Sequence, residues 1–163
     1  MRRIWAPWRM QYIRNPDKNK SCILCDKPDE KKDKANYILY RGKYNYIILN
    51  AFPYTPGHLM VAPYRHLDNI NDLAMKEAAE HVRLVQLGVR LLEKEAHPDG
   101  FNLGMNLGKV AGAGLDKHIH THIVPRWNGD HNFMTVLADV RVLGEGLDVT
   151  YQKLMKCLPE LLK

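Results

Sequence analysis

The amino-acid sequence predicts an α+β fold, in which a five-stranded antiparallel meander sheet packs against one long helix and one C-terminal helix. Three observations support this prediction. Short strand-like segments separated by turns come first, a long helical repeat of apolar residues follows, and two more strand-like segments precede a final amphipathic helix. This order is typical of domains whose helices cover a mainly antiparallel sheet.

The first three predicted strands form an antiparallel meander. They cover Tyr37–Tyr40, Tyr44–Asn50 and His58–Ala62. Arg41-Gly42 and Pro56-Gly57 supply turns between them, because glycine reaches backbone conformations that other residues avoid and proline fixes one dihedral angle.

A long amphipathic helix is predicted next, capped by Asn71 or Asp72 and running to about His97. Pro98 and Gly100 end it, since neither residue favours the interior of a helix. Its apolar residues recur at helical spacing, namely Leu73, Met75, Ala78, Ala79, Val82, Val85, Val89 and Leu92.

Two further strands and one helix complete the predicted fold. The strands cover Phe101–Leu107 and Lys117–Val124, and a glycine-bearing connection joins them. The closing helix is predicted at roughly Asp148–Leu162, where apolar residues again recur at helical spacing.

The length of 163 residues and the 45% hydrophobic content favour a single domain with a real core over residues 1–163. Residues 1–36 form a mostly irregular N-terminal arm that carries a Cys-x-x-Cys pair. Residues 37–127 form the core, and residues 128–163 form a C-terminal segment with its helix.

The formal charge of +6 favours an anionic partner, either a small molecule or a polyanion. The densest basic patch, Lys27–Lys34, is interrupted by acidic residues and resembles a solvated linker, so nucleic acid is an unlikely partner. No apolar stretch could span a bilayer, and the N-terminus lacks a secretion signal, so we expect a cytoplasmic protein without a membrane partner.

Three histidines, His118, His120 and His122, stand at every second position of the last predicted strand. Alternate residues of a strand point to one face, so the three rings are expected to crowd together there. Buried polar groups without partners cost about 1–3 kcal/mol each. Such an arrangement therefore favours a functional site over a strand that serves only the core.

A neutral imidazole can attack an electrophile at neutral pH without first losing a proton. Phosphorus is the favoured target here. The segment Gly112–Gly114 can bring backbone N–H groups close to phosphate oxygens because no side chain intervenes, and Asn106 offers a neutral donor nearby. A plain flexible hairpin is the alternative interpretation of the glycines.

The run His118-Ile119-His120-Thr121-His122-Ile123-Val124 resembles the signature of the histidine triad (HIT) nucleotide hydrolases and transferases, in which Thr121 replaces an apolar residue. Asn50, Pro56-Gly57-His58-Leu59 and the block Asn106–His122 are similar to the family's pattern in order and spacing. The flanking Ile4–Met10, Asn50–Tyr54 and Pro125–Asp130 are most similar to the branch of bacterial diadenosine tetraphosphate phosphorylases.

The resemblance implies a role for each site residue. His120 would be the nucleophile that forms a nucleotidyl-histidine intermediate. His122 would donate to a phosphate oxygen or the leaving group, and His58 would lie against His120 to fix its tautomer. Asn50 would hold the ribose hydroxyls. The α-phosphate would be held by Asn106, Gly112 and Gly114.

The implied activity is cleavage of diadenosine tetraphosphate with inorganic phosphate as acceptor, which gives ADP and ATP. The alternative is hydrolysis of dinucleoside polyphosphates or nucleoside phosphoramidates, with water as acceptor. A non-catalytic nucleotide-binding module is the alternative from another functional class. Proteins of this family generally form homodimers that extend the sheet to ten strands, and no organic cofactor is implied.

The Cys-x-x-Cys pair of Cys22 and Cys25 fits zinc binding, redox activity or chance when taken alone. Some family members bind a structural zinc ion with such a pair, a histidine after the third strand and the first triad histidine. The resemblance therefore implies that Cys22, Cys25, His66 and His118 form a Cys2His2 site.

Several residues near these motifs are open to more than one interpretation. His81, His97 and His131 are expected at the surface. Trp127 could stack on a nucleobase or simply pack. Where relatives tend to place an extra donor six residues before the nucleophile, this chain has Gly114, so a backbone N–H or Lys109 would have to replace it.

Overall fold

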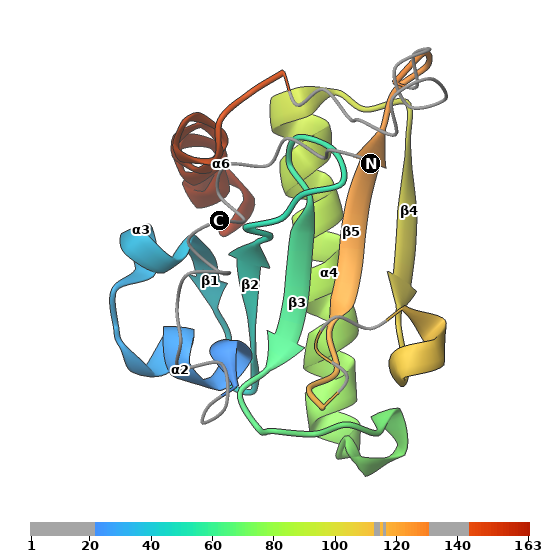
Figure 1. The fold of residues 1–163 in the computed structure, drawn as a ribbon. Helices are drawn as coiled ribbons and strands as arrows, with labels where there is room; N and C mark the ends of the chain where they lie inside the picture. Colours follow the sequence, from blue (N-terminus) through green and yellow to red (C-terminus); the bar gives the residue numbers. More distant parts are fainter. Residues whose placement is uncertain (1–21, 113–114, 116, 131–143) are drawn as a thin grey trace, which may run out of the picture.

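Five antiparallel strands form one sheet in the computed structural model (Figure 1), in the order β1-β2-β3-β5-β4. The structure describes residues 22–112, 115, 117–130 and 144–163. The strands are β1 (Ile38–Arg41), β2 (Asn45–Leu49), β3 (Leu59–Pro63), β4 (Gly100–Met105) and β5 (Thr121–Arg126). The helices are α2 (Ile23–Asp29), α3 (Asp33–Asn36), α4 (Met75–Ala96) and α6 (Leu147–Leu161), with short 3-10 turns η1 (Ile70–Asp72) and η2 (Lys109–Ala111). The predicted α+β fold is confirmed.

The predicted five-stranded meander is wrong at one point, because β5 lies between β3 and β4. β1, β2 and β3 pair in sequence, as predicted, and α4 then carries the chain across the sheet so that β5 lies between β3 and β4. In this register His122 lies opposite both Met60 and Gly104. The strand that carries the last triad histidine is therefore held on both sides.

One face of the sheet packs against α4, which runs behind the sheet in Figure 1, and α6 packs beside α4. The helix forms here because leucines recur on one side of it; Leu84, Leu87, Leu91 and Leu92 are all buried. Gly88 lets the helix approach the sheet, since a Cβ atom there would lie 2.6 Å from Cδ1 of Ile123. The long helix is therefore a closely packed support for β5.

The opposite face of the sheet packs against α2. Leu24 of this helix is buried among Tyr46, Met60 and neighbouring residues of β1 to β3. The hydroxyl of Tyr46 donates a hydrogen bond of 2.6 Å to the carbonyl of Leu24. The helix that carries the two N-terminal cysteines is thus fixed to the sheet face that also carries His122.

The predictions for the segments before β1 and before α4 are wrong. Residues 22–36 hold α2 and α3, whereas an irregular arm was expected from their many charged residues and prolines. The long helix begins at Met75, because the carboxylate of Glu77 accepts from the backbone N–H of Ala74 (2.8 Å) at its start. The expected capping region instead forms η1, whose first turn is capped by the side chain of Asn69.

Other predictions concern segments that the structure does not describe. Gly114, His131 and the part of the N-terminal arm before Cys22 lie outside the described residues. Among the helices that the structure does describe, none combines the length and apolar character needed to cross a membrane.

Candidate active site and metal site

The three triad histidines do not share one strand face. β5 begins at Thr121, so only His122 lies in the strand, while His118 and His120 precede it in irregular backbone. The prediction of a continuous strand over Lys117–Val124 is wrong at its start. As a result the rings separate into two groups, and His118 lies with the cysteines while His120 lies with His122.

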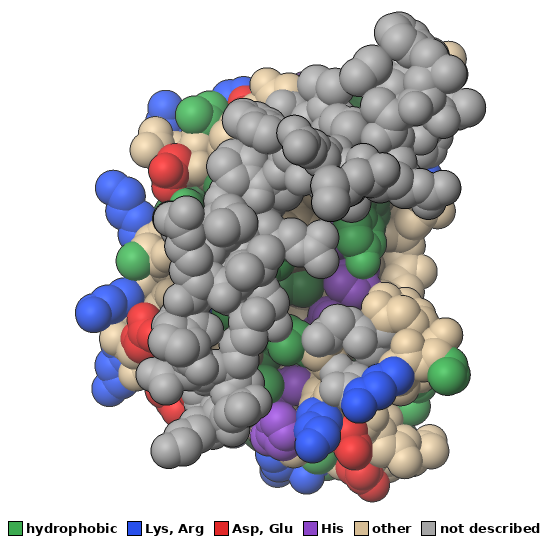
Figure 2. Space-filling view, viewed as in Figure 1, with side chains coloured by type: hydrophobic (Ala, Val, Ile, Leu, Met, Phe, Trp, Pro, Cys, Tyr) green, Lys and Arg blue, Asp and Glu red, His purple; other side chains and the backbone are tan. Residues whose placement is uncertain are grey.

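β5 begins only at Thr121 because the backbone just before it bonds to the loop after β3 and not to a neighbouring strand. The N–H of Ile119 donates to the carbonyl of Leu67, in the loop after β3, at 2.7 Å. Ile119, Thr121 and Ile123 are buried, and so are His118 and His120, so this part of the chain lies inside the protein on both sides. Histidine side chains reach the surface at two places on the sheet face opposite α4 (Figure 2).

His120 is oriented by the backbone just before it. Its Nδ1 lies 2.8 Å from the carbonyl oxygen of His118. A carbonyl only accepts hydrogen bonds, so Nδ1 carries the proton and donates. Nε2 therefore keeps its lone pair, which is the electronic state that a nucleophilic imidazole requires.

His58 contacts His122 and not His120. The backbone N–H of Tyr54 donates to Nδ1 of His58 (3.1 Å), so the proton of this ring lies on Nε2. That Nε2 lies 2.9 Å from Nδ1 of His122, which must then accept and carry its own proton on Nε2. The implied contact of His58 with His120 is corrected accordingly, because the tautomer of His120 is set by a carbonyl.

Burial, and then the neighbouring rings, lower the pKa values of these histidines. The pKa of His58 is lowered to about 3, by burial first and then by His122 and His120. The pKa of His122 is lowered to about 4, by burial first and then by His120. Burial also lowers the pKa of His120. The lowered pKa values favour the neutral form of all three rings at pH 7. The rings of His120 and His122 meet edge to face at 4.8 Å between centroids.

Asn50 lies behind His58. Its Nδ2 is 3.3 Å from Nδ1 of His58, and its Oδ1 accepts from the backbone N–H of Phe52 at 2.9 Å. The side chain thus holds the turn that leads into β3. Contact with ribose hydroxyls stays a prediction, and it would use the acceptor capacity left on Oδ1.

The residues expected to hold phosphate follow β4. Asn106 is half-buried, and its side chain makes no hydrogen bond to any other residue in the described part of the chain. Gly112 ends η2 with φ at +86°, a left-handed conformation that glycine adopts without strain. Phosphate binding by these two residues and by Gly114 stays a prediction.

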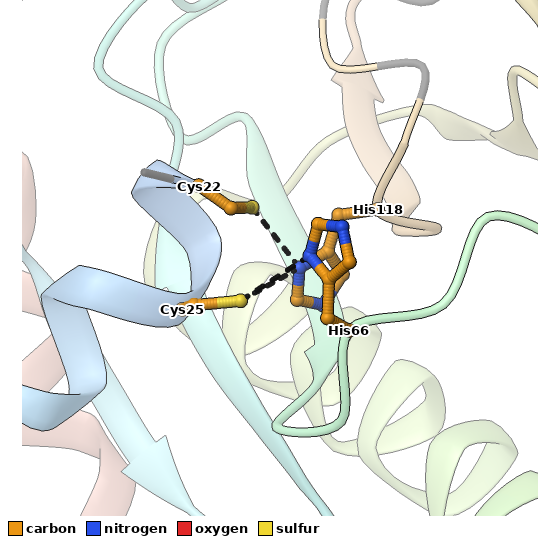
Figure 3. A group of neighbouring side chains, drawn as sticks. All are labelled: Cys22, Cys25, His66 and His118. Atoms are coloured by element: carbon orange, nitrogen blue, oxygen red, sulfur yellow. Dashed lines mark hydrogen bonds between the residues drawn. The ribbon is translucent and has the colours of Figure 1, made fainter. Parts of the chain in front are cut away.

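The second site brings together Cys22, just before α2, Cys25 within α2, His66 of the loop after β3, and His118 (Figure 3). Their potential ligand atoms all lie within 4.8 Å of one another. The Sγ atom of Cys22 lies 3.2 Å from Nδ1 of His118, and the Sγ of Cys25 lies 3.4 Å from Nδ1 of both histidines. All four ligands that the sequence predicts are therefore in one place.

This cluster fits a tetrahedral zinc ion. Zinc bonds of about 2.0–2.3 Å place ligand atoms roughly 3.5 Å apart, close to the separations observed here. Nε2 of His118 lies 2.9 Å from the carbonyl of Pro63 and donates to it, so that Nδ1 faces the thiols with its lone pair. A backbone carbonyl in this position is a frequent partner of a zinc-bound histidine.

Sequence reasoning misplaced His81, missed the contact that fixes the tautomer of His58, and left the role of Trp127 open. His81 was expected at the surface but is 4% exposed in the core. The backbone N–H of Tyr54 fixes the tautomer of His58, and no residue type signals such a contact. Trp127 is held by a hydrogen bond from Nε1 to the carbonyl of Ala96, which favours the packing interpretation of this residue.

Comparison with known proteins gives consistent results. The model of the HIT domain family matches residues 31–129. A protein of Mycobacterium tuberculosis named AP-4-A phosphorylase is 39% identical over 151 residues, which is 88% of this chain and 77% of that protein. A bis(5'-adenosyl)-triphosphatase of Saccharomyces cerevisiae is 34% identical over 91 residues, which is 55% of this chain and 44% of the yeast protein.

A solved structure extends the likeness to the fold. The crystal structure of a zinc-bound histidine triad family protein from Mycobacterium smegmatis superposes with a TM-score of 0.70 and 27% sequence identity. The match covers 86% of this chain and 95% of that protein.

Proposed function

Because the chain belongs to the HIT domain family, we propose that it cleaves dinucleoside polyphosphates by transferring a nucleotidyl group through His120. The substrate class is supported by the relative named AP-4-A phosphorylase, which matches 88% of this chain. The observation that carries the chemistry is the hydrogen bond from Nδ1 of His120 to the carbonyl of His118, which leaves Nε2 as a free base.

In the first half of the proposed reaction, Nε2 of His120 attacks the α-phosphorus of diadenosine tetraphosphate. A nitrogen–phosphorus bond to AMP forms, and the bond to the bridging oxygen breaks, so that ATP leaves. Nε2 of His122 carries a proton because its Nδ1 faces His58, and it donates this proton towards the leaving group or a phosphate oxygen.

In the second half, an oxygen of inorganic phosphate attacks the same phosphorus and displaces His120. The product is ADP, and the ring returns to its neutral form. Asn106 and the backbone around Gly112 would stabilise the negative charge on the nonbridging oxygens with donors that are already in place. The sum is diadenosine tetraphosphate plus phosphate giving ADP and ATP.

Zinc at Cys22, Cys25, His66 and His118 would have a structural role. Four protein ligands close a tetrahedral site and leave no position for substrate. The similar histidine triad protein from Mycobacterium smegmatis is zinc-bound, which supports zinc as the metal. The proposed compartment is the cytoplasm, because thiols there stay reduced and available to a metal.

A homodimer is the assembly that we propose. Among the strands that the structure describes, β4 lies at an edge of the sheet, and Leu103 on it is 52% exposed. An exposed strand edge pairs readily with another strand, and two copies joined in this way would form a ten-stranded sheet. Multi-angle light scattering should then give twice the mass of one chain; the mass of a single chain would exclude this assembly.

Hydrolysis is the second candidate, and the similarity to a bis(5'-adenosyl)-triphosphatase favours it. Both candidates share the covalent half-reaction and differ in the acceptor. The test is product analysis with diadenosine tetraphosphate in the presence and absence of phosphate. Phosphorolysis predicts turnover only with phosphate and ADP with ATP as products, whereas AMP formed without phosphate would establish water as the acceptor.

A further inference from the structure

A buried polar network outside the reacting groups joins α4 to the first residue of β5. His81 of α4 has its Nδ1 2.9 Å from Oδ1 of Asn45 and its Nε2 2.7 Å from Oγ1 of Thr121. Nδ2 of Asn45 donates to the carbonyl of Glu77 (3.0 Å) and to the carboxylate of Glu80 (3.2 Å). His81, Asn45 and Thr121 are all buried, so this network is shielded from water.

The surroundings fix where the protons lie. Because Nδ2 of Asn45 faces two acceptors, its Oδ1 faces His81, and Nδ1 of His81 must donate. Nε2 of His81 then accepts from the hydroxyl of Thr121. Burial lowers the pKa of His81 to about 4, so the ring keeps this arrangement at pH 7.

Thr121 stands where the regular pairing of β5 stops. It lies opposite Val61 and Met105 in the sheet, and the residue before it is His120. His120 lies outside the strand, and its ring is held by the carbonyl of His118. The side chain of Thr121 therefore links the residue next to the candidate nucleophile to α4, the helix that supports the sheet.

We propose that the His81–Thr121 hydrogen bond positions His120 for attack on phosphorus, an inference that rests on the proposed function. The bond fixes the peptide between residues 120 and 121 to α4, which packs closely on the sheet through Gly88. Rotation of that peptide would move Nε2 of His120. A displacement of about 1 Å at a reacting atom can cost roughly 100-fold in rate.

The competing interpretation is that Thr121 merely fills the core. Valine has nearly the same shape and would fill the same space, but it would leave Nε2 of His81 without a partner. A filling role therefore predicts that Thr121→Val changes stability alone. A positioning role predicts that it also slows chemistry, and that Thr121→Ser, which keeps the hydroxyl, restores the rate.

The test uses the full-length, zinc-loaded protein and diadenosine tetraphosphate with phosphate. We expect Thr121→Val to lower kcat by about 10- to 100-fold while KM changes by less than about twofold. Thr121→Ser and His81→Gln, which keep a donor and an acceptor respectively, should stay within about threefold of the wild-type rate. Leu158→Ala on α6, a buried residue far along the chain from the site, is the control for lost stability alone.

A second readout does not depend on turnover. The ¹⁵N NMR spectrum of the His120 ring reports its tautomer, which should be fixed in the wild type and mixed in Thr121→Val. If the wild type does not turn over this substrate, the proposed function fails and the spectra alone decide the present proposal. A Thr121→Val variant with the kcat of Leu158→Ala, or with an unchanged His120 spectrum, would overturn it.

Discussion

Backbone groups decide the protonation of the candidate active-site histidines. The carbonyl of His118 places the proton of His120 on Nδ1, and the N–H of Tyr54 places that of His58 on Nε2. Nε2 of His58 then donates to Nδ1 of His122, so the proton of His122 lies on its Nε2. A base and a donor thus lie side by side, which nucleotidyl transfer requires.

This arrangement makes His58 a positioning residue for His122. In His58→Phe, Nδ1 of His122 loses its donor, and the proton of His122 is no longer held on Nε2. We expect kcat for diadenosine tetraphosphate to fall by roughly 10- to 100-fold with KM nearly unchanged, while His58→Gln, which keeps a donor, loses less. A raised KM at normal kcat would instead assign His58 to substrate binding.

The resemblance to the HIT family, rather than the residue types alone, predicted which histidines gather at the site, and it did not predict how they bond. His122 contacts both His58 and His120, and the four predicted metal ligands also converge. The partners that set the tautomers are main-chain atoms, which look alike at every position of a sequence. His81 was misplaced for a related reason, since its partners lie on distant strands.

The element that most affects the site is α2. It presents Cys22 and Cys25 to His118 and packs Leu24 against the sheet. The sequence indicated an irregular arm because charged residues and prolines outnumber apolar ones there. This segment instead forms a short helix that is held by a few apolar contacts and that brings two thiols to the metal site. Seven residues are too few for apolar periodicity to predict such a helix.

Zinc bound to His118 should therefore stabilise the segment His118–His122, which carries the candidate nucleophile. We predict one zinc ion per chain, and removal of zinc by a chelator should lower Tm by roughly 10 °C, because binding energy in such sites is folding energy. Cys25→Ser should abolish binding. Cys157→Ser on α6 is the matched control and should bind zinc normally; equal zinc content in both variants would refute the assigned ligands.

The hydrogen bond between α2 and β2 gives a second prediction. The hydroxyl of Tyr46 is the donor to the carbonyl of Leu24, and Tyr46 is fully buried. Tyr46→Phe should lower the free energy of unfolding by about 1–2 kcal/mol in urea, because a buried carbonyl is left unpaired. The same change at the half-buried Tyr44 should cost less than about 0.5 kcal/mol; similar losses in both variants would contradict this account of how α2 is held.

For the molecule as a whole, the buried neutral histidines link stability to pH. The folded-state pKa values of His58, His81 and His122 are about 3, 4 and 4, below the value of about 6.5 expected in the unfolded chain. Between pH 6.5 and 4 the unfolded chain binds more protons than the folded one. Stability must therefore fall as the pH drops through this window.

Each of these groups can contribute up to about 1.4 kcal/mol per pH unit to that loss. Urea unfolding of the zinc-loaded protein at pH 7, 6 and 5 should show the free energy of unfolding decreasing towards acid. In His81→Gln one of the three titrating histidines is absent, so the free energy of unfolding should depend less steeply on pH. A free energy of unfolding that is constant or higher at pH 5 would mean that these rings are protonated in the folded protein.

The central claim is that His120 is transiently bonded to a nucleotide phosphorus, and trapping that bond tests it most directly. The protein is mixed with radiolabelled diadenosine tetraphosphate without phosphate, quenched in base and digested for mass spectrometry. We predict an acid-labile, base-stable AMP adduct on the peptide that contains His120, absent from His120→Ala. Turnover by an enzyme that carries no adduct, or an adduct on another residue, would contradict the account.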